Sequence, residues 1–383
     1  MSGRSAFIYS PEYTGYRLSE THPLDPIRLK LTASLIEDAG LLVGPDVVAV
    51  APRMGTEEEL LLAHDLEYVD RVREVSESGR TAHPLMDFGL GPGDTPSFAG
   101  MHEATSLVVG GSVLGADLVL NGGATHAFNP GGGLHHAMRR LASGFCIYND
   151  ASIAVAWLRR HGARVLYIDT DAHHGDGVQA AFYDDPGVLT ISIHESGRFL
   201  FPGTGGVEER GVGAGFGYAV NVPVQPYTHH ASFVECYDIV VPTLARQFKP
   251  DVIVAQSGCD SYVEDPLTHL HASTRTFEHY ARQAHDLAHE LCEGRLLVLG
   301  GGGYALWTGV PRAWTAVWAA VSHQALPFDV PSAWRARWQT EARASLPLLM
   351  HDVDDELVVL PRQEEITAVN RRIAQSVASR GLG

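Results

Sequence analysis

The sequence predicts an α/β fold, with a mostly parallel central sheet flanked by helices. Two observations lead to this prediction. Short apolar runs recur along the chain, and stretches of helical length and pattern lie between them. Several of these runs are almost continuously apolar, which is typical of strands that are covered on both faces. Strands that alternate with helices indicate a parallel sheet.

The expected strands are short apolar runs at residues 6–9, 124–128, 164–169, 188–193, 218–224, 251–256 and 295–300. The expected helices cover residues 25–40, 101–120, 149–162 and 273–294. The first helix should begin with Asp25 as its N-cap and Pro26 at the first helical position, and should end at Gly40. The Gly-rich stretch 195–217 is long for a loop within a compact domain, and such loops are usually functional or disordered.

The length of 383 residues and the apolar content of 45 % are enough for one large α/β domain or two smaller ones. We assign residues 1–325 to a single main domain. Residues 326–383 mix Trp, Arg and Glu. They are expected to form a peripheral helical tail packed on the same domain.

The net charge of −17 and the absence of a long Lys/Arg cluster argue against direct nucleic-acid binding. A basic peptide or a cationic small molecule suits this surface better. We expect no secretory signal and no membrane span, because no charged region precedes an apolar one at the N-terminus and no apolar run approaches ~18 residues. The four cysteines do not form a disulfide framework and are expected to be buried. These features fit a cytoplasmic protein.

Polar side chains follow several of the expected strands, where open α/β sheets bind ligands. Asp171 and His173 alternate on an extended segment, so both can face one point. Asp260 follows a different strand and could approach the same point. Two carboxylates and one imidazole match a divalent-cation site with open positions, as catalytic zinc sites require. Each residue alone could equally be a cap, a turn residue or a buried histidine, so the prediction depends on all three.

His135 and His136 form a pair after three glycines, and Asp169 and Asp176 could bind their second ring nitrogens. A carboxylate behind an imidazole fixes its tautomer and stabilises its cation. Two aspartate ligands would cancel the 2+ charge of a metal ion and weaken its effect on bound water, so a nearby base is needed. The histidine pair could supply this base, although either imidazole could instead be a hydrogen-bonding residue of the core.

Tyr304 follows four glycines, residues 300–303, which could form a tight turn. A phosphate cradle is disfavoured, because the lysine and spacing of a P-loop are missing. In a metal site, the glycines would let the backbone approach the ion and the phenol would donate to a developing oxyanion. Phe145 and Phe201 also lie among glycines, and they either pack in the core or flank a slot for an aliphatic stem.

Taken together, these stretches resemble the histone deacetylase family of zinc amidohydrolases, and within it the bacterial acetoin-utilization deacetylases. The resemblance covers more than three quarters of the chain and implies the single-domain arginase/deacetylase fold. The motifs that carry it are THPLDPIRL (21–29), GDTPSF (93–98), HAFNPGGGLHHAM (126–138), SGFCIYND (143–150), YIDTDAHHGDGV (167–178), FPGTGG (201–206), SGCDSYVEDPL (257–267) and LGGGGY (299–304).

The resemblance also implies a role for each matching residue. His136 would be the general base and then the general acid, His135 its electrostatic partner, and Tyr304 the group that polarises the acyl carbonyl. The other implied roles are zinc ligation by Asp171, His173 and Asp260, support of the histidine pair by Asp169 and Asp176, an acyl-lysine tunnel walled by Phe145 and Phe201 beside Gly144 and Leu267, and a rim carboxylate at Asp94. A structural K⁺ or Na⁺ is implied near Asp169, Asp171, Ser192 and His194, and Fe²⁺ could replace Zn²⁺.

The implied activity is the zinc-dependent removal of acetyl or other short acyl groups from the Nε amine of protein lysine, with an acyl-CoA synthetase as a candidate partner. Hydrolysis of acetylpolyamines or other small N-acyl amines is the alternative. A two-manganese ureohydrolase is disfavoured, because Gly175 stands where a further Asp ligand would be needed. A non-catalytic acyl-lysine binder is disfavoured, because Tyr304 and all three ligands are present. The acyl group and the oligomeric state stay open.

Overall fold

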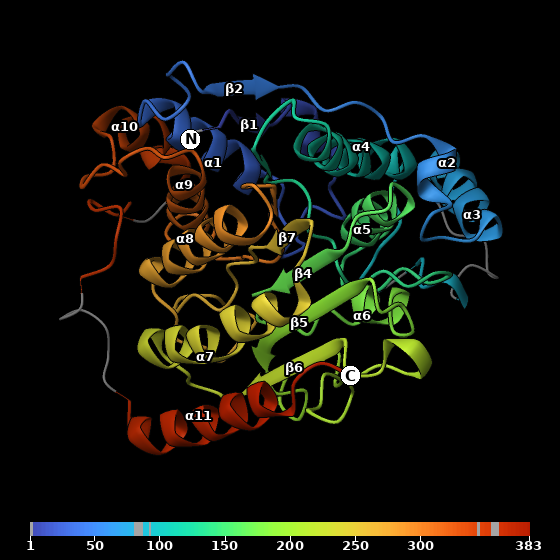
Figure 1. Ribbon diagram of the computed structural model, residues 1–383. Helices are drawn as coiled ribbons and strands as arrows, with labels where there is room; N and C mark the ends of the chain where they lie inside the picture. Colours follow the sequence, from blue (N-terminus) through green and yellow to red (C-terminus); the bar gives the residue numbers. More distant parts are fainter. Residues whose placement is uncertain (1–2, 80–86, 92, 343–344, 354–359) are drawn as a thin grey trace.

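Parallel strands form one central sheet in the computed structural model, which describes residues 3–79, 87–91, 93–342, 345–353 and 360–383 (Figure 1). The order across the sheet is β2-β1-β3-β8-β7-β4-β5-β6, and every neighbouring pair is parallel. The strands are β1 (Ser5–Ile8), β2 (Val47–Val50), β3 (His126–Asn129), β4 (Val165–Asp169), β5 (Val188–Glu195), β6 (Ala219–Val224), β7 (Val252–Gln256) and β8 (Leu296–Leu299).

Helices cover both faces of this sheet. One face packs against α4, α5 and α6, and the other packs against α1, α7, α8 and α9 (Figure 1). The helices are α1 (Ile27–Asp38), α2 (Glu57–Leu60), α3 (Leu66–Ser78), α4 (Met101–Leu120), α5 (Asp150–Arg160), α6 (Asp176–Ala181), α7 (His230–Phe248), α8 (Thr274–Leu291), α9 (Val310–Val321), α10 (Ser332–Ala342) and α11 (Gln363–Arg380). The prediction of a single α/β domain with a parallel sheet is confirmed.

The alternation of side chains along β4 shows how the two apolar layers are built. Val165 and Tyr167 pack into the cluster beneath α4 and α5, while Leu166 and Ile168 pack into the cluster on the other face. All four are buried, and each buried aliphatic side chain of this kind contributes roughly 1.5–3 kcal/mol relative to exposure. Because both faces are covered, the strand is apolar at nearly every position.

The start of α1 differs from the prediction. The helix begins at Ile27 and Pro26 is its N-cap. The Asp25 carboxylate still accepts a hydrogen bond from the Ile27 N–H at 2.9 Å, as an Asx turn does, so it satisfies a helix N–H from one position further out. The short edge strand β2 was not predicted. It is only partly buried, so its sequence carries a weak apolar signal.

Helix α4 is long and apolar enough to span a membrane, with a mean hydropathy of 1.4 over its best window. However, 67 % of that window is buried inside the protein, where α4 packs on α5 and β3. These are the properties of a core helix. The four cysteines are buried and free, as expected.

The described part of the C-terminal segment includes α10 and α11, which pack on the sheet-containing body. Trp334 and Trp338 of α10 bury against Leu31 and Leu35 of α1, and α11 packs on α7 and β6. This arrangement suits the expected peripheral tail, while the exact boundary at 325/326 stays a prediction.

Candidate active site

The carboxyl ends of neighbouring strands lie level at one edge of the sheet. Strand pairing places one residue from each of five adjacent strands in a single row, namely Asn129, Leu299, Gln256, Asp169 and Ser192. The loops that leave this row carry most of the side chains that the sequence singled out, whereas Asp94 lies between α3 and α4. Segments far apart in the chain therefore meet at one place because of strand order.

Asp171, His173 and Asp260 come together directly beyond this row. His173 Nδ1 lies 3.1 Å from Asp171 Oδ1 and 2.9 Å from Asp260 Oδ2. One potential ligand atom of each residue lies within 4.8 Å of the others, and all three residues are buried. The structure thus places the predicted metal ligands around one point.

The remaining carboxylate oxygens of this triad are bound by other groups. Asp260 Oδ1 accepts from the Ala172 N–H at 2.7 Å. Asp171 Oδ2 accepts from the Gly302 N–H at 2.7 Å and from Gln256 Nε2 at 2.9 Å. These bonds fix each carboxylate so that its other oxygen faces the common point. Gln256 was not predicted, because a glutamine that ends a strand looks like an ordinary polar residue.

The backbone passes too close to the triad for any side chain at Gly302. A Cβ atom there would lie 2.0 Å from Asp260 Oδ2 and 2.8 Å from Asp171 Oδ2. A Cβ atom on Gly258 would lie 2.1 Å from Asp171 Oδ2. The glycines before Tyr304 therefore allow the close approach that the sequence predicted.

The two histidines of the GGGLHH segment each bind a separate carboxylate. His135 Nδ1 donates to Asp169 Oδ2 at 2.8 Å, and His136 Nδ1 donates to Asp176 Oδ1 at 2.7 Å. The Nε2 atoms of the two rings lie 3.1 Å apart. Asp169 is itself held by the Tyr167 hydroxyl at 2.9 Å. Both imidazoles are thus oriented by the aspartates expected from the sequence.

The two imidazoles have opposite protonation preferences. Burial alone would lower the pKa of His135, but the carboxylates of Asp169 and Asp171 outweigh it and raise this pKa to about 9. Burial and the neighbouring positive charge of His135 lower the pKa of His136 to about 4, despite the opposing effect of Asp176. At neutral pH the pair therefore consists of a cation at His135 and a free base at His136.

Asp150 positions the loop that carries this pair. Its carboxylate accepts from the N–H groups of Gly133 and Leu134 at 3.0 and 2.8 Å. Gly133 has φ of +89°, which a residue with a side chain rarely adopts. Asp150 was not predicted as part of the site, although it lies in the SGFCIYND motif.

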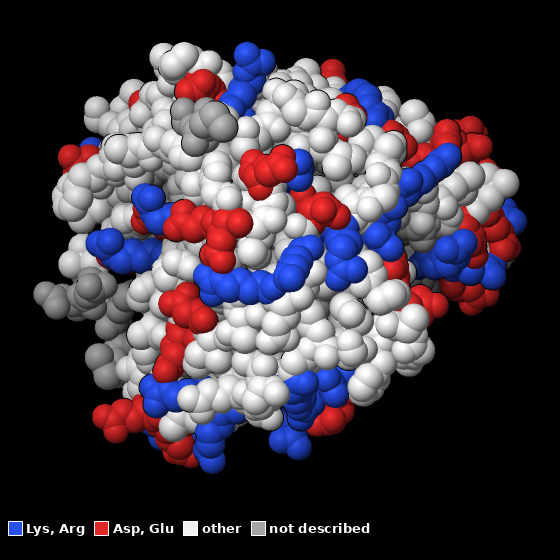
Figure 2. All heavy atoms as spheres, viewed as in Figure 1, with Lys and Arg blue, Asp and Glu red and all other residues white. Residues whose placement is uncertain are grey.

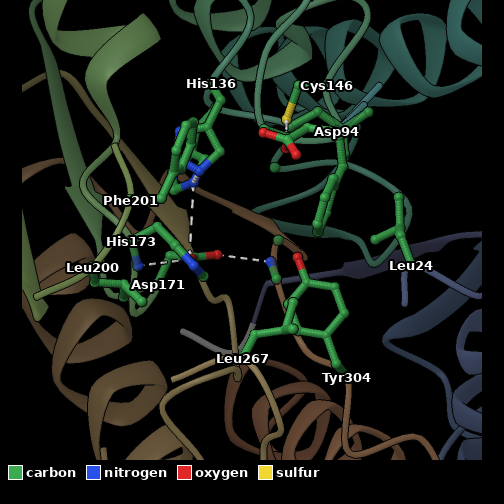
Figure 3. A pocket seen from close by; sticks show the side chains of 17 residues that line it. Leu24, Asp94, His136, Cys146, Asp171, His173, Leu200, Phe201, Leu267 and Tyr304 are labelled. Carbon is green, nitrogen blue, oxygen red and sulfur yellow. Dashed lines mark hydrogen bonds and ion pairs between the residues drawn. The ribbon is translucent and has the colours of Figure 1, made fainter. Parts of the chain in front are cut away.

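A cavity of about 220 Å³ leads from the surface to the triad and the histidine pair (Figure 3). In Figure 3, His136 and Tyr304 lie on opposite sides of it, with Asp171 and His173 at its inner end. The lining also includes Leu24, Asp94, Leu134, Gly144, Phe145, Cys146, Leu200, Phe201 and Leu267. The sequence did not indicate Leu24, Leu134, Cys146 or Leu200, because isolated apolar residues carry no signal of a pocket.

The predicted aromatic walls are held by different means. Phe145 has φ of +70°, and its carbonyl accepts from the Tyr16 hydroxyl at 2.7 Å, which helps to hold this strained backbone. Phe201 belongs to the predicted long loop, is 41 % exposed and packs edge-on against His136 with ring centroids 5.0 Å apart. Asp94 is exposed at the mouth, where His22 Nε2 donates to its carbonyl at 3.2 Å. The carboxylate of Asp94 is therefore available to a ligand at the rim.

Tyr304 is positioned through its backbone. Its N–H donates to Asp265 Oδ2 at 2.7 Å, and Arg28 donates to the neighbouring Gly303 carbonyl at 3.1 Å. The ring stands edge-on to Phe145 at 5.8 Å between centroids. Asp265 and Arg28 were not predicted, because they bind the backbone of the segment that carries Tyr304.

Two residues of the expected monovalent-cation site bind each other. Ser192 Oγ and His194 Nδ1 lie 2.7 Å apart, and Ser192 pairs in register with Asp169. The cation itself stays a prediction. On the face shown in Figure 2, Lys and Arg side chains lie among Asp and Glu side chains.

Comparison with known proteins places this geometry in a family. The sequence profile described as "Histone deacetylase domain" matches residues 22–321. The acetoin utilization protein AcuC of Bacillus subtilis (strain 168) is 46 % identical over 375 residues, covering 98 % of this chain and 96 % of that protein. AcuC of Staphylococcus aureus (strain MRSA252) is 40 % identical over 378 residues, covering 98 % and 97 %.

A solved structure shares the fold as well as the sequence pattern. It is the crystal structure of an HDAC homolog complexed with SAHA, with a TM-score of 0.84 and 29 % identity, covering 96 % of this chain and all of that one. The profile match spans most of the chain, and the AcuC relatives match over nearly their full length. This chain therefore belongs to the histone deacetylase family, as an AcuC-type member.

Proposed function

We propose that this protein is a zinc-dependent protein-lysine deacetylase. The observation that carries the proposal is the meeting of the Asp171–His173–Asp260 triad with the His135–His136 pair along one cavity. The triad can hold a metal ion, and the histidine pair can accept and donate a proton. The cavity can admit an unbranched side chain.

The triad fits a divalent transition metal. Two carboxylates and an imidazole point to one place, and the carboxylate oxygens directed elsewhere are already bonded. A bound Zn²⁺ would supply a Lewis acid that polarises the acyl carbonyl and lowers the pKa of water. Fe²⁺ suits the same donor set, so metal analysis must decide between the two ions.

His136 is the group that removes a proton from the attacking water. Its low pKa keeps it unprotonated at neutral pH, and Asp176 holds its Nδ1–H so that Nε2 carries the lone pair. The proton taken up by His136 can then be given to the amine that leaves. The fixed cation of His135 favours the negative charge that develops on the acyl oxygen.

Tyr304 donates a hydrogen bond to the same developing oxyanion from the other side of the cavity. Its neutral phenol is a hydrogen-bond donor at any physiological pH, since burial raises its pKa well above the ordinary value. A donor aimed at developing negative charge typically contributes ~10²–10³ in rate.

The shape and lining of the cavity favour an acylated lysine over a polyamine. Phe145, Phe201 and Leu267 contribute apolar surface to its lining, which suits the methylene stem of lysine. Acetylputrescine carries an ammonium group in place of lysine Cα, so it lacks the flanking peptide N–H groups that a carboxylate at the rim can bind. The exposed carboxylate of Asp94 can accept peptide N–H groups at the rim. We therefore do not favour the small-molecule alternative.

The physiological setting follows from the same proposal. An acylated lysine of an acyl-CoA synthetase is the substrate expected from the family resemblance, and the cytoplasm is the expected location. Neither nucleic acid nor a membrane is an expected partner, and a K⁺ or Na⁺ near Asp169 is expected to support the site.

Metal-stripped protein, with and without one equivalent of Zn²⁺ or Fe²⁺, should be assayed on an acetyl-lysine peptide and on acetylputrescine. We expect metal-restored release of acetate from the peptide, with little from acetylputrescine. Cleavage of acetylputrescine alone would transfer the same chemistry to small-molecule metabolism. Metal binding without either cleavage would contradict the deacetylase proposal.

A further inference from the structure

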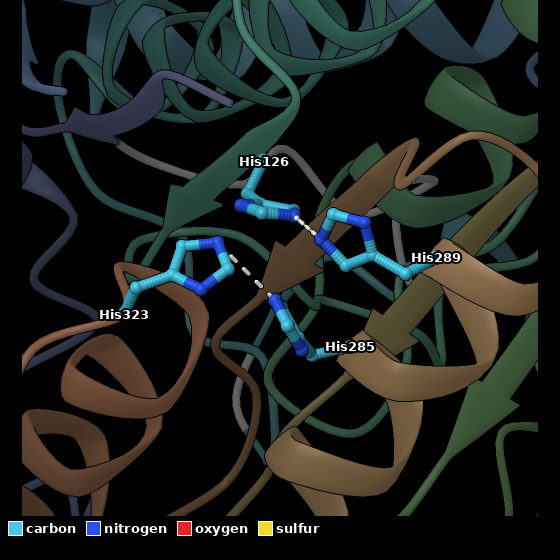
Figure 4. Close-up of side chains that lie close together, drawn as sticks. All are labelled: His126, His285, His289 and His323. Atoms are coloured by element: carbon cyan, nitrogen blue, oxygen red, sulfur yellow. Dashed lines mark hydrogen bonds between the residues drawn. The ribbon is translucent and has the colours of Figure 1, made fainter. Parts of the chain in front are cut away.

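Four histidines meet at the edge of the sheet opposite to the candidate active site. His126 is the first residue of β3, at its amino end, whereas the active-site loops leave the carboxyl ends of the strands. His285 and His289 lie one turn apart on α8, and His323 follows the end of α9 (Figure 4). Neither the strand-end motifs nor the family resemblance pointed to this cluster.

The four rings surround one point. One ring nitrogen of each histidine lies within 4.8 Å of those of the others. His126 Nε2 is 3.1 Å from His289 Nε2, and His285 Nε2 is 3.3 Å from His323 Nε2. Four nitrogens arranged tetrahedrally at the Zn–N distance of about 2.0–2.1 Å would be separated by roughly 3.3 Å. The two separations given above match that arrangement.

The partners of the outer ring nitrogens direct the lone pairs inward. Ser5 Oγ donates its hydrogen to the Val321 carbonyl at 3.1 Å, so it accepts from His126 Nδ1 at 3.2 Å. His285 Nδ1 donates to Asp286 Oδ1 at 3.1 Å. With the proton on Nδ1, the Nε2 atoms of His126 and His285 carry the lone pairs that a metal ligand requires.

Three of the four imidazoles are biased toward the neutral form. Burial and the three neighbouring histidines lower the pKa of His126 to about 2, so this ring is neutral. Burial and His285 likewise lower the pKa of His289 and of His323. Neutral imidazole is the form that binds a metal, so little proton release opposes binding.

We propose that His126, His285, His289 and His323 form a second metal site, which binds a divalent transition-metal ion of the Zn²⁺, Ni²⁺ or Cu²⁺ class through four imidazole nitrogens. Ca²⁺ and Mg²⁺ are excluded from this class because they require oxygen ligands. The four imidazoles leave no position for a catalytic water in a tetrahedral site, so the ion is structural. It ties β3, α8 and the end of α9 together across the amino edge of the sheet.

The proposal is tested by counting bound metal in protein that carries no polyhistidine tag. The wild type should retain two Zn²⁺ per chain after gel filtration. His285→Ala/His289→Ala should retain one and keep its deacetylase activity at wild-type level. The matched control His279→Ala removes an imidazole from the same helix outside the cluster and should retain two.

A separate variant isolates the new site from the catalytic one. In His173→Ala/Asp260→Ala the catalytic ligands are lost, so one Zn²⁺ should remain, and Co²⁺ in its place should give the intense visible absorption of a tetrahedral site. His323→Gln, added to His173→Ala/Asp260→Ala, should weaken Zn²⁺ binding at the four-histidine site at least tenfold. This variant leaves α8 unchanged, so the test still holds if His285→Ala/His289→Ala misfolds. The proposal would be overturned if His173→Ala/Asp260→Ala bound no metal. It would also be overturned if His285→Ala/His289→Ala retained two Zn²⁺. Neither outcome depends on whether the protein is a deacetylase.

Discussion

His135 Nε2 lies 3.1 Å from His136 Nε2, and the opposite nitrogen of each ring is bound to its own aspartate. Before His136 takes up a proton, only one of the two facing nitrogens carries one. The more strongly negative surroundings of His135 assign the proton to that ring and leave His136 as a free base. His135 therefore holds a proton next to His136, and His136 stays unprotonated.

The first prediction concerns this shared proton. In the metal-free protein, His135 should titrate near pH 9 and His136 near pH 4, measured by ¹⁵N chemical shifts of the imidazole rings. Since the pKa of His135 is raised on folding, its contribution to stability is full below the unfolded value of about 6.5 and is lost as the pH rises through 9. Asp169→Asn should lower the pKa of His135. Two ordinary titrations near 6.5 would contradict this account.

The second prediction concerns proton transfer. His136→Ala should lower kcat by roughly 10²–10⁴ with metal content unchanged, because the base is lost but no ligand is. Asp176→Asn should have a smaller effect in the same direction, since it leaves the imidazole in place but removes its oriented acceptor. Steady-state kinetics on an acetyl-lysine peptide, with metal analysis of the same samples, measures both. Near-wild-type turnover of His136→Ala would remove His136 from the mechanism.

The third prediction concerns the phenol. Tyr304→Phe keeps the ring against Phe145 but loses the donor, so kcat should fall by about 10²–10³ while KM changes little. A thermal unfolding midpoint equal to that of the wild type would show that packing is preserved. An effect on KM alone would mean that the phenol binds the ground state rather than the transition state.

The fourth prediction concerns close backbone approach. Gly302→Ala places a Cβ atom 2.0 Å from Asp260 Oδ2, so a metal ligand must move and metal affinity should fall at least tenfold. Gly206→Ala is the matched control, because its nearest neighbour to a new Cβ is the Glu209 carboxylate at 3.6 Å. Competition with a chelator measures both affinities. Equal affinities would show that the glycine run has no role in shaping the site.

The fifth prediction separates peptide from small-molecule substrates. Asp94→Ala should raise KM for an acetyl-lysine peptide by roughly tenfold, in keeping with the loss of hydrogen bonds to a charged group. It should leave the KM for N-pentylacetamide nearly unchanged, because that compound has the acylated stem but no backbone N–H groups. An equal change for both compounds would show that Asp94 does not read the peptide backbone.

Much of the fold and site could be predicted because the signals are local. Apolar runs covered on both faces marked β4, β5 and β7, and the chemistry-bearing residues follow directly after such strands, as Asp171 and His173 do after β4. Residues that position the site by hydrogen bonds to another segment gave no such local signal. Gln256, Asp150 and Asp265 became visible only once their bonds to Asp171, the Gly133 loop and Tyr304 were known.

The sequence by itself determined the class of fold, the metal-ligand candidates and the histidine pair, since hydrophobic pattern and residue spacing act within single segments. Tertiary structure alone decided which strands are neighbours, and hence that residues from β3, β4, β5, β7 and β8 share one edge. It also decided which of His135 and His136 keeps the proton, because that depends on carboxylates from other segments. The four-histidine cluster is the clearest case: its members are up to 197 residues apart (126 to 323), and only the packing of β3, α8 and α9 brings them together.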